Sequence, residues 1–124
     1  MSMEKVAVPA ENGQGLNSPV SSHFGHAPVF VLSTIKDGEI QDVELLDNRT
    51  HGGCGGLIAT LAGRGVQVLI VLGMGGRPFM MAQQAGMPVV RAIGSTVSEA
   101  IENYVKGRSS HVQDEELCAG GGRH

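Results

Sequence analysis

The hydrophobic and polar positions of this chain follow one rhythm in its first half and another in its second. In the first half, residues 5–9, 29–35 and 40–46 form short apolar runs of the length and composition that are typical of strands. Asp37 and Gly38 lie between the last two runs, and an Asp-Gly pair suits a two-residue type I′ turn. We therefore predict one strand followed by a β-hairpin. The apolar pattern within 40–46 slips by one position, which indicates a β-bulge.

In the second half, apolar strands alternate with helical patterns. Residues 66–72 form a near-continuous apolar strand, as expected where both faces of a sheet are covered, and residues 89–91 form another strand. We expect helices to begin at Leu57, near Pro78, and after a capping box that starts at Thr96. The predicted buried face of the first helix holds four apolar residues: Leu57, Ile58, Leu61 and Ala62.

This order of elements predicts an α/β fold with a single domain over residues 1–107. We expect a five-stranded mixed sheet, in which three antiparallel strands are followed by parallel ones, with helices on both faces. Residues 108–124 are polar and then glycine-rich, so we expect a flexible tail, which carries Cys118 and His124. In open α/β sheets, ligands bind at the carboxyl ends of the parallel strands.

Composition and charge narrow the range of functions. The chain has a net charge of −3, 3% aromatic residues and no basic patch with interleaved aromatics, so we expect no nucleic-acid partner. The longest apolar run, residues 66–72, is too short to span a bilayer, and the N-terminus shows no secretory signal. We therefore expect a cytoplasmic protein without a membrane partner. In that compartment its two cysteines are more often reactive or metal-binding than joined in a disulfide.

The densest chemistry lies in a glycine loop that we predict over residues 47–56. His51 and Cys54 stand three positions apart in a run of four glycines, and a helical pattern follows. The thiol is therefore expected at or just before a helix N-terminus, where free N–H groups and the helix dipole favour a thiolate or a bound anion. Glycines also let the backbone approach a ligand closely and adopt positive φ.

Two other loops carry further candidates. In the long loop over residues 10–28, two histidines have the same spacing as His51 and Cys54, and this spacing lets neighbouring side chains reach one ion. Thiolate and imidazole together suit iron, copper, zinc or an iron–sulfur cluster. A second glycine loop, over residues 73–78, contains an arginine that could balance an anionic charge. The candidate metal ligands are His23, His26, His51 and Cys54. The candidate cofactor-binding residues are Gly25, Gly52, Gly53, Gly55, Gly75, Gly76 and Arg77.

Less specific interpretations of these residues stay open. His26 and Arg77 fit a hydrogen-bonded or solvated surface position equally well, and His23 could satisfy backbone groups of its own loop. Cys54 could be an inert thiol beneath the helix, because free cysteine is often buried. Met74 is a weaker ligand candidate within the second glycine loop.

Five segments together resemble the dinitrogenase iron–molybdenum cofactor-binding family, the NifX-like domains. The segments are residues 6–9, 18–28, 51–53, 73–77 and 94–100, and the resemblance extends over about residues 4–107. It implies a ribonuclease H-like fold and a carrier role for the iron–molybdenum cofactor or a related cluster, in organisms with or without nitrogenase. His23 matches the family's loop histidine. Position 26 is commonly Arg in the family and Cys54 is not universal, so these two residues depart from its pattern.

Two functions of different classes follow. The first is a carrier or scaffold for an anionic iron-, molybdenum- or copper-containing sulfide cluster, exchanged with a donor or acceptor protein. The second is a metal-independent domain that binds a small anion or has a regulatory role. We do not expect an enzyme, because the sequence offers Cys54 no acid–base partner except His51. The two-metal nuclease chemistry of some ribonuclease H-like folds needs carboxylates that converge from strands, and residues 6–8 and 66–72 have none.

Overall fold

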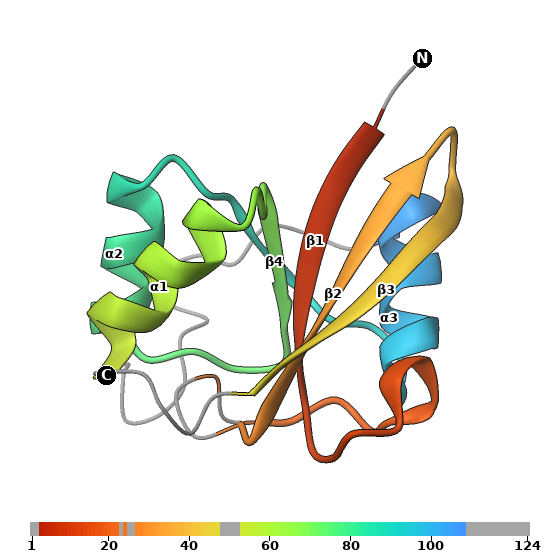
Figure 1. Ribbon diagram of the computed structural model, residues 1–124, viewed down its shortest axis with the longest axis horizontal. Helices are drawn as coiled ribbons and strands as arrows, with labels where there is room; N and C mark the ends of the chain where they lie inside the picture. The colour runs from red at the N-terminus through yellow and green to blue at the C-terminus, as the bar shows by residue number, and fades with distance from the viewer. Residues whose placement is uncertain (1–2, 23, 25–26, 48–52, 109–124) are drawn as a thin grey trace.

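A computed structural model describes residues 3–22, 24, 27–47 and 53–108, with the backbone alone for residues 53–55. The described chain forms a five-stranded mixed sheet with the strand order β3-β2-β1-β4-β5 and helices on both faces (Figure 1). The strands are β1 (Met3–Ala10), β2 (Val29–Lys36), β3 (Glu39–Asp47), β4 (Val68–Val71) and β5 (Val89–Arg91). β2 is antiparallel to β1 and β3, whereas β4 is parallel to β1 and to β5. This is the ribonuclease H-like topology, and it confirms the predicted fold class.

The β2–β3 hairpin has the predicted turn and the predicted irregularity. Asp37 and Gly38 both have positive φ, 53° and 83°, as a type I′ turn requires. The register then shifts between Ile40 and Asp42, so that Gln41 is an extra residue in β3. The predicted β-bulge is therefore confirmed, and it explains the slip in the apolar pattern of residues 40–46.

The described helices cover the sheet from both sides (Figure 1). α1 (Gly53–Gly63) and α2 (Gly76–Gln84) lie on one face, and α3 (Val97–Val105) lies on the other. Buried side chains fall accordingly into two clusters. The first, which we call the α1/α2 core, includes Phe24, Phe30, Leu57, Leu61, Leu69 and Met74. The second, which we call the α3 core, includes Val6, Val8, Val31, Ile70, Val97 and Ile101.

Three details of the predicted elements were wrong. α1 begins at Gly53 rather than at Leu57, so the first glycine loop ends earlier than predicted. Glycine costs a helix about 1 kcal/mol relative to alanine, and packing of the helix against the sheet overrides that local cost. Ala62, which was expected on the buried face of α1, is exposed. β4 is limited to Val68–Val71, shorter than the apolar run 66–72.

The start of α3 is the predicted capping box. Thr96 Oγ1 accepts a hydrogen bond from the N–H of Glu99 at 3.2 Å, and the Glu99 carboxylate accepts bonds from the N–H groups of Ser95 and Thr96. The bond from Ser95 N–H is the main reason why the pKa of Glu99 lies below its usual value. The N–H of Val97 donates to the carbonyl of Ser18 at 2.9 Å, so the start of α3 also holds the loop that follows β1.

Candidate functional site

The carboxyl ends of four described strands meet at one edge of the sheet, which we call the carboxyl edge. Ala10 ends β1 and Asp47 ends β3, and both align with Val29 of the strand between them. Val71 ends β4 and pairs with Arg91, which ends β5. The chain continues from β3 to α1 and from β4 to α2, so both helices begin at this edge (Figure 1).

α2 presents an open N-terminus at the carboxyl edge. Its N-cap residue, Gly75, has an extended backbone (φ −69°, ψ 165°), and no described side chain caps this end. The next residues are Gly76, Arg77 and Pro78, and Pro78 has no N–H group. The N–H groups of Gly76 and Arg77 are therefore left without an acceptor inside the helix. Together with the helix dipole and the exposed Arg77 side chain, they favour an anion.

The fold does not require glycine at position 75, the N-cap of α2. Gly73, Gly75 and Gly76 all lack positive φ, so the backbone conformation of this loop does not call for glycine. A Cβ atom placed on Gly75 would meet only Pro78 among the described residues, at ordinary van der Waals distances of 3.7 and 3.9 Å. A side chain would therefore fit at position 75. What glycine provides there is uncovered backbone, which allows a ligand to approach closely.

The start of α1 has similar properties. Because α1 begins at Gly53, the backbone of Cys54 lies in the first helical turn. The first turn of α1 contains no acidic residue, so no carboxylate of that turn competes with a thiolate or an anion for the helix dipole. At Gly56, a Cβ atom would stand in open space among the described residues. The described glycines of both helix starts thus leave room at the carboxyl edge.

Two contacts hold the described part of the loop that carries the two predicted histidine ligands. The N–H of Ser21 donates to the carbonyl of Pro9 at 2.8 Å, which ties the loop to the end of β1. Phe24 is buried and packs edge-on against Phe30 of β2, with 5.2 Å between the ring centroids. One buried cluster joins Phe24 of the histidine loop, Leu57 of α1 and Met74 of the second glycine loop.

The structure describes only some of the predicted site residues. Gly75, Gly76 and Arg77 lie together at the start of α2, and the backbones of Gly53, Cys54 and Gly55 lie at the start of α1. The predictions for His23, Gly25, His26, His51 and Gly52 fall outside the described residues, as do Cys118 and His124. Among the described residues, no group of three or more His, Cys, Asp or Glu residues is placed so that it could hold a metal ion.

Met74 is not a ligand candidate in this structure. Its side chain is 1% exposed and belongs to the α1/α2 core. The residue fixes the second glycine loop to the core and does not face the carboxyl edge with a free sulfur.

None of the described helices has both the length and the apolar content needed to cross a membrane.

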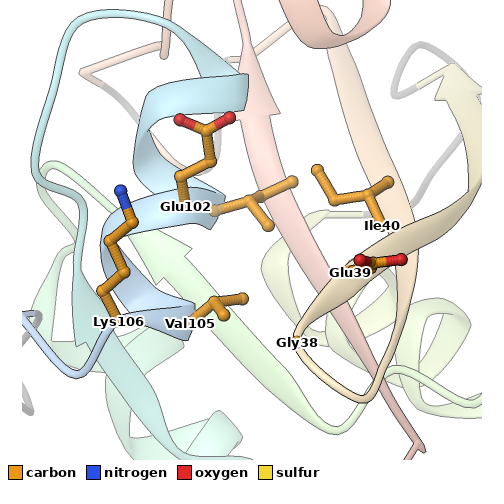
Figure 2. Close-up of a pocket in the computed structure, with 7 residues that line it drawn as sticks. Gly38, Glu39, Ile40, Glu102, Val105 and Lys106 are labelled. Atoms are coloured by element: carbon orange, nitrogen blue, oxygen red, sulfur yellow. The ribbon is translucent and has the colours of Figure 1, made fainter.

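A hollow that the sequence analysis did not predict lies at the opposite end of the sheet. It has a volume of about 340 Å³ and lies between the hairpin turn and the C-terminal half of α3 (Figure 2). Its lining residues are Gly38, Glu39, Ile40, Ile101, Glu102, Val105 and Lys106. The two segments are distant in sequence, so only the packing of α3 on the sheet brings them together. The sequence patterns predicted the hairpin and the helix on either side and gave no sign of a hollow between them.

Comparison with known proteins identifies the family. Residues 4–107 match the family model described as dinitrogenase iron-molybdenum cofactor. The chain belongs to this family. The matched residues include all the described helices and strands except Met3, the first residue of β1. The resemblance found in the sequence is therefore confirmed over almost the same residues.

Known proteins match this chain over most of their length. An uncharacterized protein from Methanocaldococcus jannaschii is 29% identical over 108 residues, which cover 84% of this chain and 87% of the relative. A Thermotoga protein, provisionally called NifB and solved by NMR, is 30% identical with a TM-score of 0.75, covering 96% of this chain and 99% of that one. The apo form of the orange protein from Desulfovibrio gigas is also 30% identical with a TM-score of 0.75, covering 90% and 94%.

Proposed function

We propose that this protein binds an anionic metal–sulfur cluster at the carboxyl edge and acts as a carrier or scaffold for it. The cargo is the iron–molybdenum cofactor or a related iron-, molybdenum- or copper-containing cluster, which is exchanged with a donor or acceptor protein. One observation carries the proposal. Two helices begin at the same edge, with Cys54 in the first turn of one and Arg77 in the first turn of the other. Membership of a family named for a metal cofactor supports the choice of cargo.

The donor set suits such a cargo. Cys54 is assigned as a thiolate ligand, and His23, His26 and His51 as imidazole ligands, since soft sulfur and borderline nitrogen donors bind iron, copper and sulfide clusters. The backbone N–H groups of the glycines at positions 25, 52, 53, 55, 75 and 76 are assigned to the sulfides and other anionic atoms at its surface. Arg77 balances part of the negative charge. We assign no catalytic role to any of these residues.

A second function is favoured by the start of α2 alone. The N-cap glycine, the two N–H groups without a helical acceptor and Arg77 form an anion site that needs no thiol. In this alternative the protein binds a small oxyanion without metal, and Cys54 is incidental. The two functions differ in their dependence on Cys54, so one experiment separates them.

The experiment is reconstitution of the full-length protein with iron, sulfide and molybdate in the absence of oxygen. Visible absorbance and metal content are then measured after gel filtration. We expect the wild type to gain a charge-transfer spectrum with bound metal, because thiolate and sulfide ligation of these metals absorbs visible light. We expect Cys54→Ala and His23→Ala each to lose most of that absorbance, whereas Cys118→Ala serves as the matched control for the loss of one thiol.

Arg77→Gln separates the charge contribution from ligation. Loss of this cation should weaken binding of the cluster, and of molybdate alone, several-fold without changing the shape of the spectrum. Arg108→Gln, an exposed arginine beyond α3, is the matched control. Spectra that are unchanged in both Cys54→Ala and His23→Ala would remove the carrier function. Binding of molybdate that depends on Arg77 but not on Cys54 would support the metal-independent alternative.

A further inference from the structure

β3 is a long outer strand whose two faces differ in chemistry. It spans nine residues, about 30 Å at the usual rise per residue, and it is paired with β2 alone among the described strands. Because of the bulge at Gln41, Ile40 and Val43 lie on the same face as Leu45, which is the face that carries α3. Val43 and Leu45 are 41% and 46% exposed. We call Ile40, Val43 and Leu45 the apolar row.

A hollow lies at each end of the apolar row. Ile40 lines the hollow between the hairpin and α3 (Figure 2), and Leu45 lines a second hollow of about 390 Å³ together with Pro28, Val29 and Asp47. Both hollows are therefore adjacent to β3, one at each end. An extended segment lying along the strand could place an apolar side chain in each of them.

The opposite face of β3 carries two carboxylates. Asp42 and Glu44 lie there, opposite Thr34 and Leu32 of β2, and the same face ends in Leu46, which is buried in the α1/α2 core. Glu44 forms ion pairs with Lys5 and with Arg64, whereas the exposed Asp42 adds negative charge to the outer strand. An added strand that alternates apolar and cationic residues would therefore match both faces, because directly opposite side chains on neighbouring strands interact favourably when their chemistry is complementary.

Charge also disfavours a second copy of this chain as the occupant. If two β3 strands paired with each other, Asp42 of each copy would meet no cation on the facing strand, because residues 39–47 contain neither Lys nor Arg. The net charge of −3 on each chain would add repulsion between the two copies.

We propose that β3 is a docking site for an extended, cationic segment of a partner protein, which adds to the sheet as a further strand. Main-chain hydrogen bonds to β3 provide the affinity, and the apolar row and Asp42 select the side chains. The C-terminal end of β3 lies at the carboxyl edge, so the docked partner is held beside that edge. The inference rests on β3 itself and does not depend on which ligand the carboxyl edge binds.

The test uses a nine-residue peptide of alternating valine and lysine, blocked at both ends, and a control peptide with glutamate in place of lysine. Backbone amide shifts of the ¹⁵N-labelled full-length protein are followed by NMR during titration with each peptide. We expect the lysine peptide to shift the amides of residues 40–46 and the glutamate peptide to leave them unchanged. We also expect the affinity for the lysine peptide to fall as salt is added, because exposed charges are screened.

Two variants test the two faces of β3 separately. Leu45→Lys should weaken binding of the lysine peptide about tenfold, because it removes the apolar row's contact at the second hollow and adds a like charge. Asp42→Asn should weaken binding of the same peptide several-fold without changing the apolar contacts. Met80→Lys is the matched control for the first variant, since Met80 is 60% exposed on α2. Thermal unfolding of each variant checks that it remains folded.

Several outcomes would overturn the proposal. These are shifts confined to residues outside β3, equal binding of the two peptides, no binding at peptide concentrations of about 1 mM, or equal weakening by Met80→Lys. Sedimentation of the protein alone is the last test. A dimer that Leu45→Lys dissociates would assign the strand to a second copy of this chain and would also overturn the proposal.

Discussion

Tyr104 shows how one side chain links two distant parts of the fold. Its hydroxyl group on α3 donates a 2.6 Å hydrogen bond to Glu4 Oε1 on β1. Partial burial raises the pKa of Tyr104 well above its usual value of 10, and the hydrogen bond to Glu4 and the negative charge of Glu4 raise it further. The neutral hydroxyl form is therefore favoured in the folded protein.

The ionisation of Tyr104 is a direct prediction, because the chain has one Tyr and no Trp. Ultraviolet titration should give a midpoint above pH 10 in the native protein, and Glu4→Gln should lower that midpoint. In the unfolded chain, the pKa returns to about 10. The stability from this pair is thus complete below pH 10 and is lost as the pH rises toward the folded pKa. A native midpoint near 10 would contradict the contact with Glu4.

At the scale of elements, helix α1 contains four glycines, and for two of them, Gly56 and Gly63, the described structure gives no reason for the absence of a side chain. Gly56 lies near its start and Gly63 at its end, and a Cβ atom on either would stand in open space among the described residues. Both positions are helical, so alanine is locally preferred there. The two sites differ in one respect, since only Gly56 lies near the helix start at the carboxyl edge.

This difference gives a matched pair of variants. Gly56→Ala and Gly63→Ala should each raise the free energy of unfolding by about 0.5–1 kcal/mol, because alanine loses less backbone entropy in a helix. Chemical denaturation measures that gain. Reconstitution with iron, sulfide and molybdate should then be impaired by Gly56→Ala and unchanged in Gly63→Ala. If Gly56→Ala binds the cluster as well as the wild type does, the open space near the start of α1 is not part of the site.

The same helix shows what local sequence patterns can and cannot predict. Leu57, Ile58 and Leu61 were correctly predicted to be buried, because their spacing matches one helical face. The start of α1 at Gly53 was missed, because the propensity of glycine opposes a helix that is stabilised by contacts with the sheet. The hollow beside Ile40 was missed for a related reason, since it depends on where α3 packs relative to the hairpin.

At the scale of the whole molecule, the location of the candidate site follows from topology more than from any single motif. Parallel strands β1, β4 and β5 direct their carboxyl ends to one edge, and this rule is the reason why we expected a ligand there. The rule gives no side-chain positions, so the assignment of His23, His51 and Cys54 as ligands stays a prediction. What the structure adds is a common anchor, the α1/α2 core, for Phe24 of the histidine loop, Leu57 of α1 and Met74 of the second glycine loop.

The two cores lie on opposite faces of the sheet. The effect of the α1/α2 core on cluster binding can therefore be tested separately from its effect on stability. Phe24 belongs to the α1/α2 core and immediately follows His23, whereas Ile101 belongs to the α3 core on the other face. Phe24→Leu and Ile101→Val should each lower the free energy of unfolding by about 1 kcal/mol, because each removes buried apolar volume. Urea denaturation checks that the two losses are comparable.

Their effects on the cargo should differ. Phe24→Leu loosens the anchor of the histidine loop, so we expect weaker binding of the reconstituted cluster and a faster loss of visible absorbance on addition of a chelator. Ile101→Val leaves the α1/α2 core intact, and its spectrum and rate of loss should match those of the wild type. Equal effects of the two variants would mean that binding follows overall stability. The loop next to Phe24 would then hold no ligand, and the cluster would have to be bound by α1 and α2 alone.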